Sequence, residues 1–188
     1  MYKVVVVISL SEAHHQSIFH IHFAHRQRKL RSQLHAQRMH ISCTGTDINM
    51  VTKYGTITAL RRGVDVNAIV IAPQVEIYKN GWEPKKVMAV LDYVTQTFRV
   101  DTNKIYVFGM SMGGSGTYKV IAAYPDKFAA GITMCGTCWV DVKPIAKVPL
   151  WVIHGVDDTA TPVSRSYDFV KKMKDGDMTS RLRYSYLE

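Results

Sequence analysis

The sequence is poor in the features that mark disulfide-rich secreted domains and membrane proteins. Its 188 residues include only three cysteines, Cys43, Cys135 and Cys138, which cannot form the paired framework of a disulfide-stabilised domain. Apolar runs are short, and Val4 to Ile8 is far below membrane-spanning length. We expect no secretory leader, because the sequence runs from Met1 directly into this first apolar run. We therefore expect one globular domain without a membrane partner, cytoplasmic as the chain stands and secreted if its N-terminus is incomplete.

Acidic residues are missing between Ala13 and Thr46, which sets this segment apart from the rest of the chain. Seven of the eight histidines lie there, together with a large share of the net charge of +9. The basic residues of the segment are Arg26, Arg28, Lys29, Arg31 and Arg38. Apolar residues at roughly helical spacing predict a basic amphipathic helix from about Gln16 to His40, although His20 to Phe23 alternates as a strand would. Residues 9–44 are therefore interpreted as an atypical His- and Arg-rich insertion.

Two specialised functions could account for this insertion, and a solvated segment is favoured over both. His22 and His25 have a spacing that could share a metal ion, but no Cys, Asp or Glu nearby completes a ligand set. Basic residues interleaved with Phe could bind nucleic acid. We expect no metal or other cofactor and keep nucleic-acid binding as a minor alternative.

Outside this segment, short apolar runs alternate with helix-forming stretches along the whole chain. The strand candidates are Tyr2 to Ile8, Ala68 to Ala72, Lys104 to Phe108, Phe128 to Met134, Leu150 to Ile153 and Arg181 to Tyr186. The helix candidates are Ile48 to Leu60, the stretch that begins at Trp82-Glu83-Pro84, Ser115 to Tyr124 and Val163 to Lys174. This order predicts an α/β fold in a single domain over residues 1–188, with a mostly parallel sheet of about six strands and helices on both faces.

The most informative stretch is Gly109-Met110-Ser111-Met112-Gly113. A β-branched and aromatic run enters this Gly-x-Ser-x-Gly sequence, and a helix-forming segment leaves it, which predicts a strand, a sharp turn and a helix. Such a turn lifts the Ser111 hydroxyl out of the sheet, while N–H groups at the helix start point toward whatever binds beside it. Ser111 is therefore predicted to be a nucleophile.

A serine nucleophile needs a base, and the base needs an acid to orient it. Asp158 follows the strand candidate that ends at Ile153, and in open parallel sheets such groups gather at the carboxyl ends of the strands. Asp158 is predicted to be this acid, with its neighbour Asp157 as the alternative. Cys135 and Cys138 have redox spacing, but they follow a strand instead of opening a helix, so we interpret them as a chance pair.

Three stretches together resemble the esterase and predicted-peptidase branch of the α/β-hydrolase superfamily, which includes feruloyl and acetyl esterases, dienelactone hydrolases and polyhydroxybutyrate depolymerases. They are Tyr106 to Thr117, Tyr124 to Ala130, and Pro149 to Gly155 with Asp158 and Pro162. The resemblance implies an α/β-hydrolase fold and an acyl-enzyme mechanism on a small-molecule or polysaccharide-linked ester. It also implies that the backbone N–H of Met112 is an oxyanion donor.

The chain departs from the family pattern at two places. Ile8 runs into Ser9-Leu10-Ser11, where the family has a His-Gly motif that supplies a second oxyanion donor. The catalytic histidine of the family lies beyond the strand matched by Arg181 to Tyr186, so the domain is expected to be truncated at its C-terminus and impaired as an enzyme. His154 matches a structural position of the family and is not expected to be the base.

The sequence thus predicts a serine hydrolase that cleaves carboxylic esters, with Ser111 as nucleophile, Asp158 as acid and Met112 at the oxyanion. Three alternatives stay open. The chain could be an inactive hydrolase scaffold used for binding, a serine peptidase, or a nucleic-acid binder that uses the basic segment.

Overall fold

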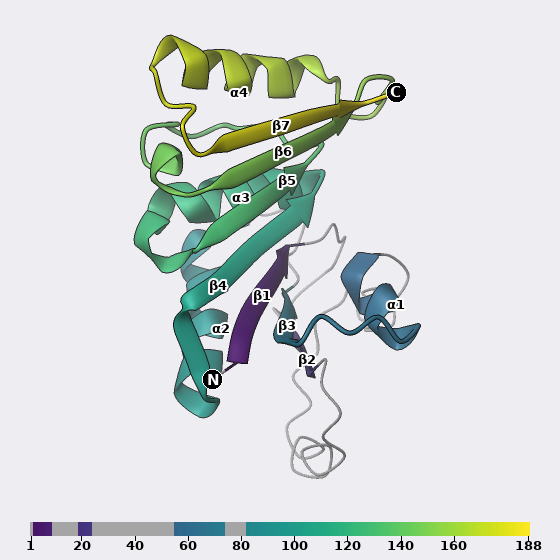
Figure 1. Cartoon of the computed structure of the whole chain (residues 1–188), viewed down its shortest axis with the longest axis vertical. Helices are drawn as coiled ribbons and strands as arrows, with labels where there is room; N and C mark the ends of the chain where they lie inside the picture. Colours follow the sequence, from purple (N-terminus) through teal and green to yellow (C-terminus); the bar gives the residue numbers. More distant parts are fainter. Residues whose placement is uncertain (1, 9–18, 24–54, 74–81) are drawn as a thin grey trace.

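The structure, a computed structural model, describes residues 2–8, 19–23, 55–73 and 82–188 (Figure 1). Its strands are β1 (Tyr2–Ile8), β2 (Phe19–Phe23), β3 (Ala68–Pro73), β4 (Val100–Met110), β5 (Ala130–Met134), β6 (Leu150–Gly155) and β7 (Leu182–Leu187). Its α-helices are α1 (Gly55–Arg61), α2 (Pro84–Thr97), α3 (Met112–Ala123) and α4 (Ser164–Asp175). Short 3-10 helices occur at η4 (Pro125–Lys127) and η5 (Ile145–Lys147).

The strands form a single sheet in the order β2-β3-β1-β4-β5-β6-β7. Every neighbouring pair is parallel except β2 and β3, which are antiparallel. As the run of valines predicted, β1 is an interior strand between β3 and β4. Because these strands are parallel, their carboxyl ends lie at the same end of the sheet. The segments that follow β4, β5 and β6 therefore emerge there side by side.

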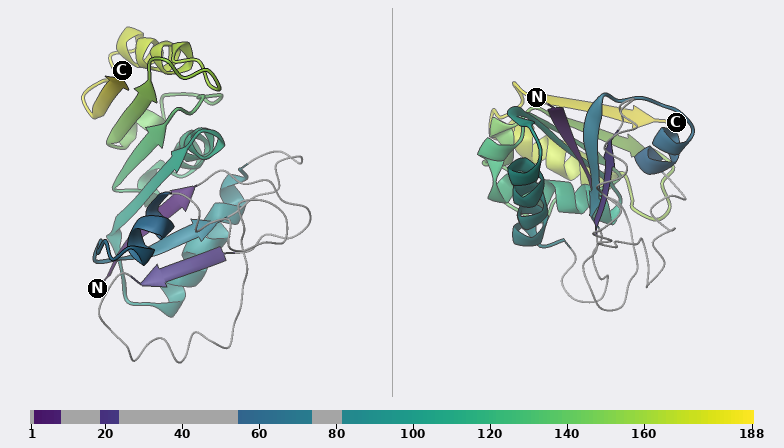
Figure 2. Two further views of the ribbon diagram at one scale, coloured as in Figure 1. Left: turned by 90° about the vertical axis from the view of Figure 1, so that its right-hand side faces the viewer. Right: turned by 90° about the horizontal axis from the view of Figure 1, so that it is seen from below.

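Helices cover both faces of the sheet, as predicted, but to different extents. The helices α2, α3 and α4 share one continuous buried cluster with the sheet, which includes Leu91, Tyr118 and Phe169. On the opposite face α1 contributes Ile57 to a small cluster with Val70 and Ala72 of β3. The right panel of Figure 2 shows α1 on the other side of the sheet from the remaining helices.

The sequence of β3 is apolar at every position because both faces of this strand are covered. Ile69 and Ile71 belong to the cluster under α2 to α4, whereas Val70 and Ala72 belong to the cluster under α1. Side chains of a strand alternate between the two faces, and both faces of β3 are covered. The periodicity of β4 differs, because Ile105 and Val107 are buried while Tyr106 and Phe108 are only half-buried.

The main correction concerns the histidine-rich segment. The predicted helix from about Gln16 to His40 is wrong at Phe19–Phe23, which forms β2 and pairs with β3 from Phe19 opposite Pro73 to Phe23 opposite Ile69. An exposed strand edge leaves backbone groups unpaired, and an added antiparallel strand satisfies them. Within the described residues the sheet consequently has seven strands, where the sequence predicted about six. The rest of the predicted helix and most of the insertion at 9–44 lie outside the described residues.

The other predicted elements lie close to their observed positions. The helix predicted from Ile48 to Leu60 is α1 over Gly55–Arg61, and residues 48–54 lie outside the described part. Pro84 occupies the first turn of α2, where its missing N–H costs nothing. None of the helices in the described part of the chain is long and apolar enough to cross a bilayer.

Candidate active site

Ser111 lies at the junction between β4 and α3. β4 ends at Met110, α3 begins at Met112, and Ser111 between them has φ 55° and ψ −118°. This backbone conformation costs a residue other than glycine about 1–3 kcal/mol, so the surrounding structure must hold Ser111 in it. One such contact is the hydrogen bond from the Ser111 N–H to the carbonyl oxygen of Met134 at 2.8 Å. The backbone therefore turns sharply at Ser111, as the Gly-x-Ser-x-Gly pattern predicts.

Close glycine contacts hold the start of α3 against the end of β5. A Cβ atom on Gly114 would lie 2.7 Å from the Met134 carbonyl oxygen, and one on Gly136 would lie 2.5 Å from the carbonyl carbon of Gly114. Neither position can accept a larger side chain without a backbone shift. The segment after β5 also contacts the first turn of α3, where the N–H of Thr137 donates to the Ser115 hydroxyl at 2.9 Å. The nucleophile turn is thus fixed by its packing against the segment that follows β5.

Met112, the predicted oxyanion residue, is the first residue of α3. The first N–H groups of an α-helix have no acceptor within the helix, and the helix dipole makes that end attractive to negative charge. The N–H of Met112 therefore lies directly beside the Ser111 turn, at the end of the helix that favours an anion. Its role as an oxyanion donor stays a prediction.

Asp158 lies in the loop between β6 and α4. Its Oδ1 accepts the backbone N–H groups of Ala160 at 2.9 Å and of Thr161 at 2.8 Å. The Thr161 N–H bond is the strongest influence that lowers the pKa of this carboxyl, followed by the Ala160 bond and the nearby His154. Asp158 is therefore ionised at neutral pH, as an acid that orients an imidazole must be. Asp157 is exposed and lies on the solvent side of this loop.

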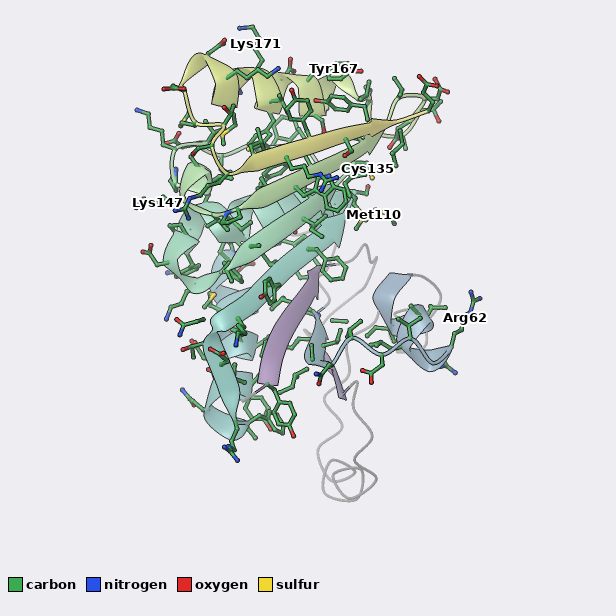
Figure 3. The ribbon with its side chains drawn as sticks, in the orientation of Figure 1. Arg62, Met110, Cys135, Lys147, Tyr167 and Lys171 are labelled. Carbon is green, nitrogen blue, oxygen red and sulfur yellow. The ribbon has the colours of Figure 1, made fainter. Side chains whose placement is uncertain are left out.

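The topology brings Ser111 and Asp158 to the same edge of the sheet. β4, β5 and β6 are adjacent, with Met110 opposite Met134 and Met134 opposite Ile153 at their carboxyl ends. Figure 3 places Met110 and Cys135 together at this edge. Cys135 follows β5 directly; burial raises the pKa of its thiol, and the nearby Asp158 charge raises it further. The structure thus places Cys135 between the two predicted catalytic residues.

The Cys-x-x-Cys spacing predicts only a chance pair and does not mark Cys135 as a neighbour of Ser111 and Asp158. The signal for this position is that Cys135 comes directly after a strand that neighbours the strand before Ser111. Cys135 and Cys138 are both free thiols.

His154, at the end of β6, has both ring nitrogens occupied. Nδ1 lies 2.7 Å from the Ser166 hydroxyl, and Nε2 lies 2.8 Å from the Thr161 carbonyl oxygen. A carbonyl oxygen only accepts, so Nε2 donates to Thr161, while Nδ1 and the Ser166 hydroxyl share the second hydrogen bond. The ring is 1% exposed. His154 therefore ties the acid loop to α4 and is not available as a base, as predicted.

Metal chemistry finds no support in the described part of the chain. Within residues 2–8, 19–23, 55–73 and 82–188, no three His, Cys, Asp or Glu side chains gather to hold an ion. Of the histidine pair considered above, His22 is in β2, and His25 lies outside the described residues.

Comparisons with known proteins agree with this geometry. The model of the prolyl oligopeptidase family matches residues 75–143, which contain the nucleophile turn. A feruloyl esterase B from Talaromyces funiculosus is 34% identical over 59 residues, which are 31% of this chain and 17% of that protein. A bifunctional acetylxylan esterase/xylanase from Neocallimastix patriciarum is 28% identical over 90 residues, 47% of this chain and 13% of that protein.

The solved structure of a thermostable esterase superposes on the whole chain with a TM-score of 0.63 and 25% identity, and 46% of that protein is covered. The predicted α/β-hydrolase fold, and the resemblance to the esterase and peptidase-like branch of that superfamily, are thereby confirmed. The chain spans less than half the length of each of these relatives.

Proposed function

We propose that the protein is a serine hydrolase that cleaves carboxylic esters through an acyl-enzyme. The observation that carries the proposal is the positive-φ turn at Ser111 between β4 and α3, with Asp158 in the loop two strands away at the same sheet edge. Turns of this kind expose a serine hydroxyl beside helix N–H donors. The esterase relatives support the ester bond as the target.

In the proposed reaction the Ser111 Oγ attacks the ester carbonyl carbon while a base takes its proton. The carbonyl oxygen becomes an oxyanion that the Met112 N–H stabilises. Collapse of the intermediate expels the alcohol, which takes up the proton, and leaves an ester between Ser111 and the acyl group. Water then attacks this ester, releases the carboxylic acid and restores the Ser111 hydroxyl.

The described residues include no candidate for the base that takes the proton of Ser111. Among the side chains that the structure describes, His154 is the histidine nearest in sequence to the site, and its nitrogens are occupied by Ser166 and Thr161. We therefore propose that these 188 residues by themselves react slowly. Enzymes without a triad member keep about 10³–10⁴-fold catalysis over water through the oxyanion site and binding.

The substrate is proposed to be a small ester or an ester linked to a polysaccharide. This proposal follows the relatives, whose names specify acetylxylan and feruloyl esters.

Addition of imidazole as an external base tests the mechanism. The chain is treated with a fluorophosphonate probe, which forms a stable bond with an activated serine, with and without added imidazole. We expect Ser111 to be labelled slowly alone and faster with imidazole, and the modified residue to be identified by peptide mass spectrometry. The variant Ser111→Ala should lose this label, and Asp158→Asn should lose most of the gain from imidazole.

Asp157→Asn is the matched control and should respond to imidazole as the unmodified chain does. Absence of any Ser111 adduct under all conditions, or an adduct that forms only at other residues, would contradict the proposed mechanism.

A serine peptidase is the second candidate, because the prolyl oligopeptidase family model matches the segment around Ser111. Parallel assays with p-nitrophenyl esters and p-nitroanilide peptides separate the two activities. We expect Ser111-dependent turnover of the esters and none of the anilides. The reverse result would favour the peptidase.

A further inference from the structure

The segment that follows β5 contacts the first turns of two helices at the edge of the sheet that carries Ser111. The Thr137 N–H donates to the hydroxyl of Ser115, in the first turn of α3, at 2.9 Å. Further along the segment, the guanidinium carbon of Arg165, in the first turn of α4, lies over the Trp139 ring at 5.6 Å from the ring centroid. Trp139 thus lies between the helix that begins at the nucleophile turn and the helix that follows the acid loop.

The indole of Trp139 is exposed, unlike those of the other two tryptophans. Trp139 is 68% exposed, the largest value among the large apolar side chains that the structure describes. Trp82 is buried in the core, and Trp151 is half-buried, with the guanidinium carbon of Arg183 4.4 Å from its ring centroid. A single exposed apolar side chain is ordinary on a protein surface. An open indole beside a candidate active site is a surface on which a ligand can stack.

The residues on both sides of Trp139 are anchored. Gly136 packs so closely on α3 that a Cβ on it would lie 2.5 Å from the carbonyl carbon of Gly114. The Cys138 side chain packs against the main core cluster, and its thiol donates to the Val140 carbonyl oxygen at 3.6 Å. The backbone therefore presents the indole at a fixed place. A ligand that stacks on a side chain held in this way pays little for ordering the chain.

The position of Trp139 suits a part of the substrate that lies away from the reacting bond. The carbonyl carbon that Ser111 attacks must lie about 3 Å from its Oγ. Ser115, the α3 residue that this segment contacts, is about 6 Å from Ser111 along the helix axis, at 1.5 Å per residue. Trp139 follows that contact along the chain. The ring is therefore placed for the group to which the ester is attached.

The chemistry of the pair fits a sugar ring. An indole face is flat and apolar, and it can stack on the C–H groups of one face of a pyranose. The guanidinium of Arg165 carries several N–H donors, which can bind the hydroxyl groups of the sugar. Because Arg165 lies over one face of the Trp139 ring and the residue is mostly exposed, the other face is open to solvent.

We propose that Trp139, together with Arg165, is a platform that binds a sugar ring of a polysaccharide-linked ester beside the nucleophile turn. The inference rests on the proposed function, since it assigns one part of that substrate to a surface of the same site. The open face of the indole takes the sugar, and the guanidinium lies over the opposite face. A sugar bound there keeps the ester that it carries close to Ser111, which favours reaction by proximity.

Acrylamide quenching of fluorescence measures the platform without any enzyme activity. Acrylamide quenches exposed indoles, so the quenchable emission should come mainly from Trp139, because Trp82 is buried and Trp151 lies under Arg183. Xylohexaose, a neutral chain of pyranose rings, should lower the quenching constant about twofold, because it shields the open face of the indole. Trp139→Ala should lose most of the quenching and all of the response to the sugar.

Calorimetry with xylohexaose then gives the contribution of each side chain. Trp139→Ala should weaken binding about tenfold, the size that one aromatic contact typically supplies. Tyr184→Ala is the matched control, because Tyr184 is also exposed and has a cation, Lys174 Nζ, 5.1 Å from its ring centroid. Lys174 is in the last turn of α4, whereas Arg165 is in the first. Tyr184→Ala should bind xylohexaose as the unmodified chain does.

Three results would overturn the platform. They are absence of xylohexaose binding to the unmodified chain, unchanged binding in Trp139→Ala, and an equal loss in Tyr184→Ala. Protection of Trp139 from acrylamide by methyl ferulate, an aromatic ester without a sugar, but not by xylohexaose would also overturn it, because the ring would then belong to the acyl group.

Turnover tests the connection between the platform and the proposed reaction. With imidazole present, kcat/KM is measured for acetylated xylohexaose and for p-nitrophenyl acetate. The ratio of the two values should fall about tenfold in Trp139→Ala and stay unchanged in Tyr184→Ala. An equal loss for both esters in Trp139→Ala would contradict a role in binding the sugar. If no ester is turned over through Ser111, the proposed function fails, and the binding experiments alone decide the platform.

Discussion

The nucleophile turn and the acid loop lie at the same sheet edge but are held in place by different forces. Around Ser111, the structure relies on a strained backbone and on contacts between glycines that leave no room for a side chain. Around Asp158, it relies on hydrogen bonds from Ala160 and Thr161 and on the His154 contacts to Ser166 and Thr161.

This difference predicts different sensitivities. A position fixed by packing responds to added volume, because close-packed backbone cannot yield without a shift. A position fixed by polar contacts responds to loss of a partner and to pH, because each buried group left without a partner is costly. Cys135 lies between the two systems, since it follows the middle strand β5 and precedes Gly136, which packs on Gly114.

The largest effect is expected from added volume at the nucleophile turn. Gly136→Ala would put a Cβ 2.5 Å from the carbonyl carbon of Gly114. We expect a loss of about 3 kcal/mol in the free energy of unfolding, measured by urea denaturation, because a core that cannot relax does not accept an extra methyl group. Gly155→Ala is the control, since its Cβ would meet nothing closer than the Leu187 carbonyl oxygen at 4.0 Å. Equal losses in both variants would contradict the packing argument.

The next effect is expected from the polar system that holds the acid loop. His154→Leu keeps an apolar side chain of similar size but leaves Ser166 and Thr161 without their partner. We expect about 2 kcal/mol less stability, from the loss of buried hydrogen bonds. Ser166→Ala should cost less, and the double variant should cost less than the sum, since both changes break one contact. Ser164→Ala, at an exposed position of the same helix, is the control.

A smaller effect should distinguish strain from packing at Ser111 itself. Both Ser111→Gly and Ser111→Ala remove the hydroxyl, but only glycine adopts φ 55° without a steric cost. The Gly variant should be more stable than the Ala variant by about 1 kcal/mol, the lower end of the cost of such a conformation. Thermal denaturation of the two variants side by side measures the difference. Equal stability would show that this turn stores no strain.

The smallest effect concerns pH. The pKa of Asp158 is lowered in the folded chain, so its contribution to stability is present above about pH 4, the unfolded value, and is lost as the pH falls through the lowered pKa. The difference in urea midpoint between the unmodified chain and Asp158→Asn should therefore shrink between pH 7 and pH 3. A difference that stays constant over this range would contradict the polar account of the loop. Asp157→Asn tests whether any nearby charge gives the same trend.

Most of the fold could be predicted from the sequence, because it depends on local patterns. The apolar runs that became β1, β3, β5, β6 and β7 alternate with helix-forming segments, and that order specifies a parallel α/β sheet. The Phe19–Phe23 strand was assigned wrongly, because the sequence fits a helix and a strand about equally well there. The free edge of β3 supports the strand, and a sequence pattern does not display that edge.

The candidate site, too, could be predicted from the sequence only in part. Gly109 to Gly113 identify Ser111 because the turn needs glycines within a few residues of it, and the strand before Asp158 identifies its edge of the sheet. The pKa of Cys135 and the hydrogen bonds of His154 depend on residues far from them in the chain, such as Asp158 and Ser166. No spacing rule reports such contacts.

The sequence by itself determined the order of strands and helices, the sharp turn at Ser111 and the strand end from which Asp158 emerges, because periodicity and glycine positions act within short stretches of chain. Only the tertiary structure decided that Phe19–Phe23 extends the sheet, that His154 is committed to α4 and the loop of Asp158, and that Cys135 follows the strand between those of Ser111 and Asp158. These outcomes depend on which distant groups meet across the sheet, and that meeting is settled only when the strands pack in their final order.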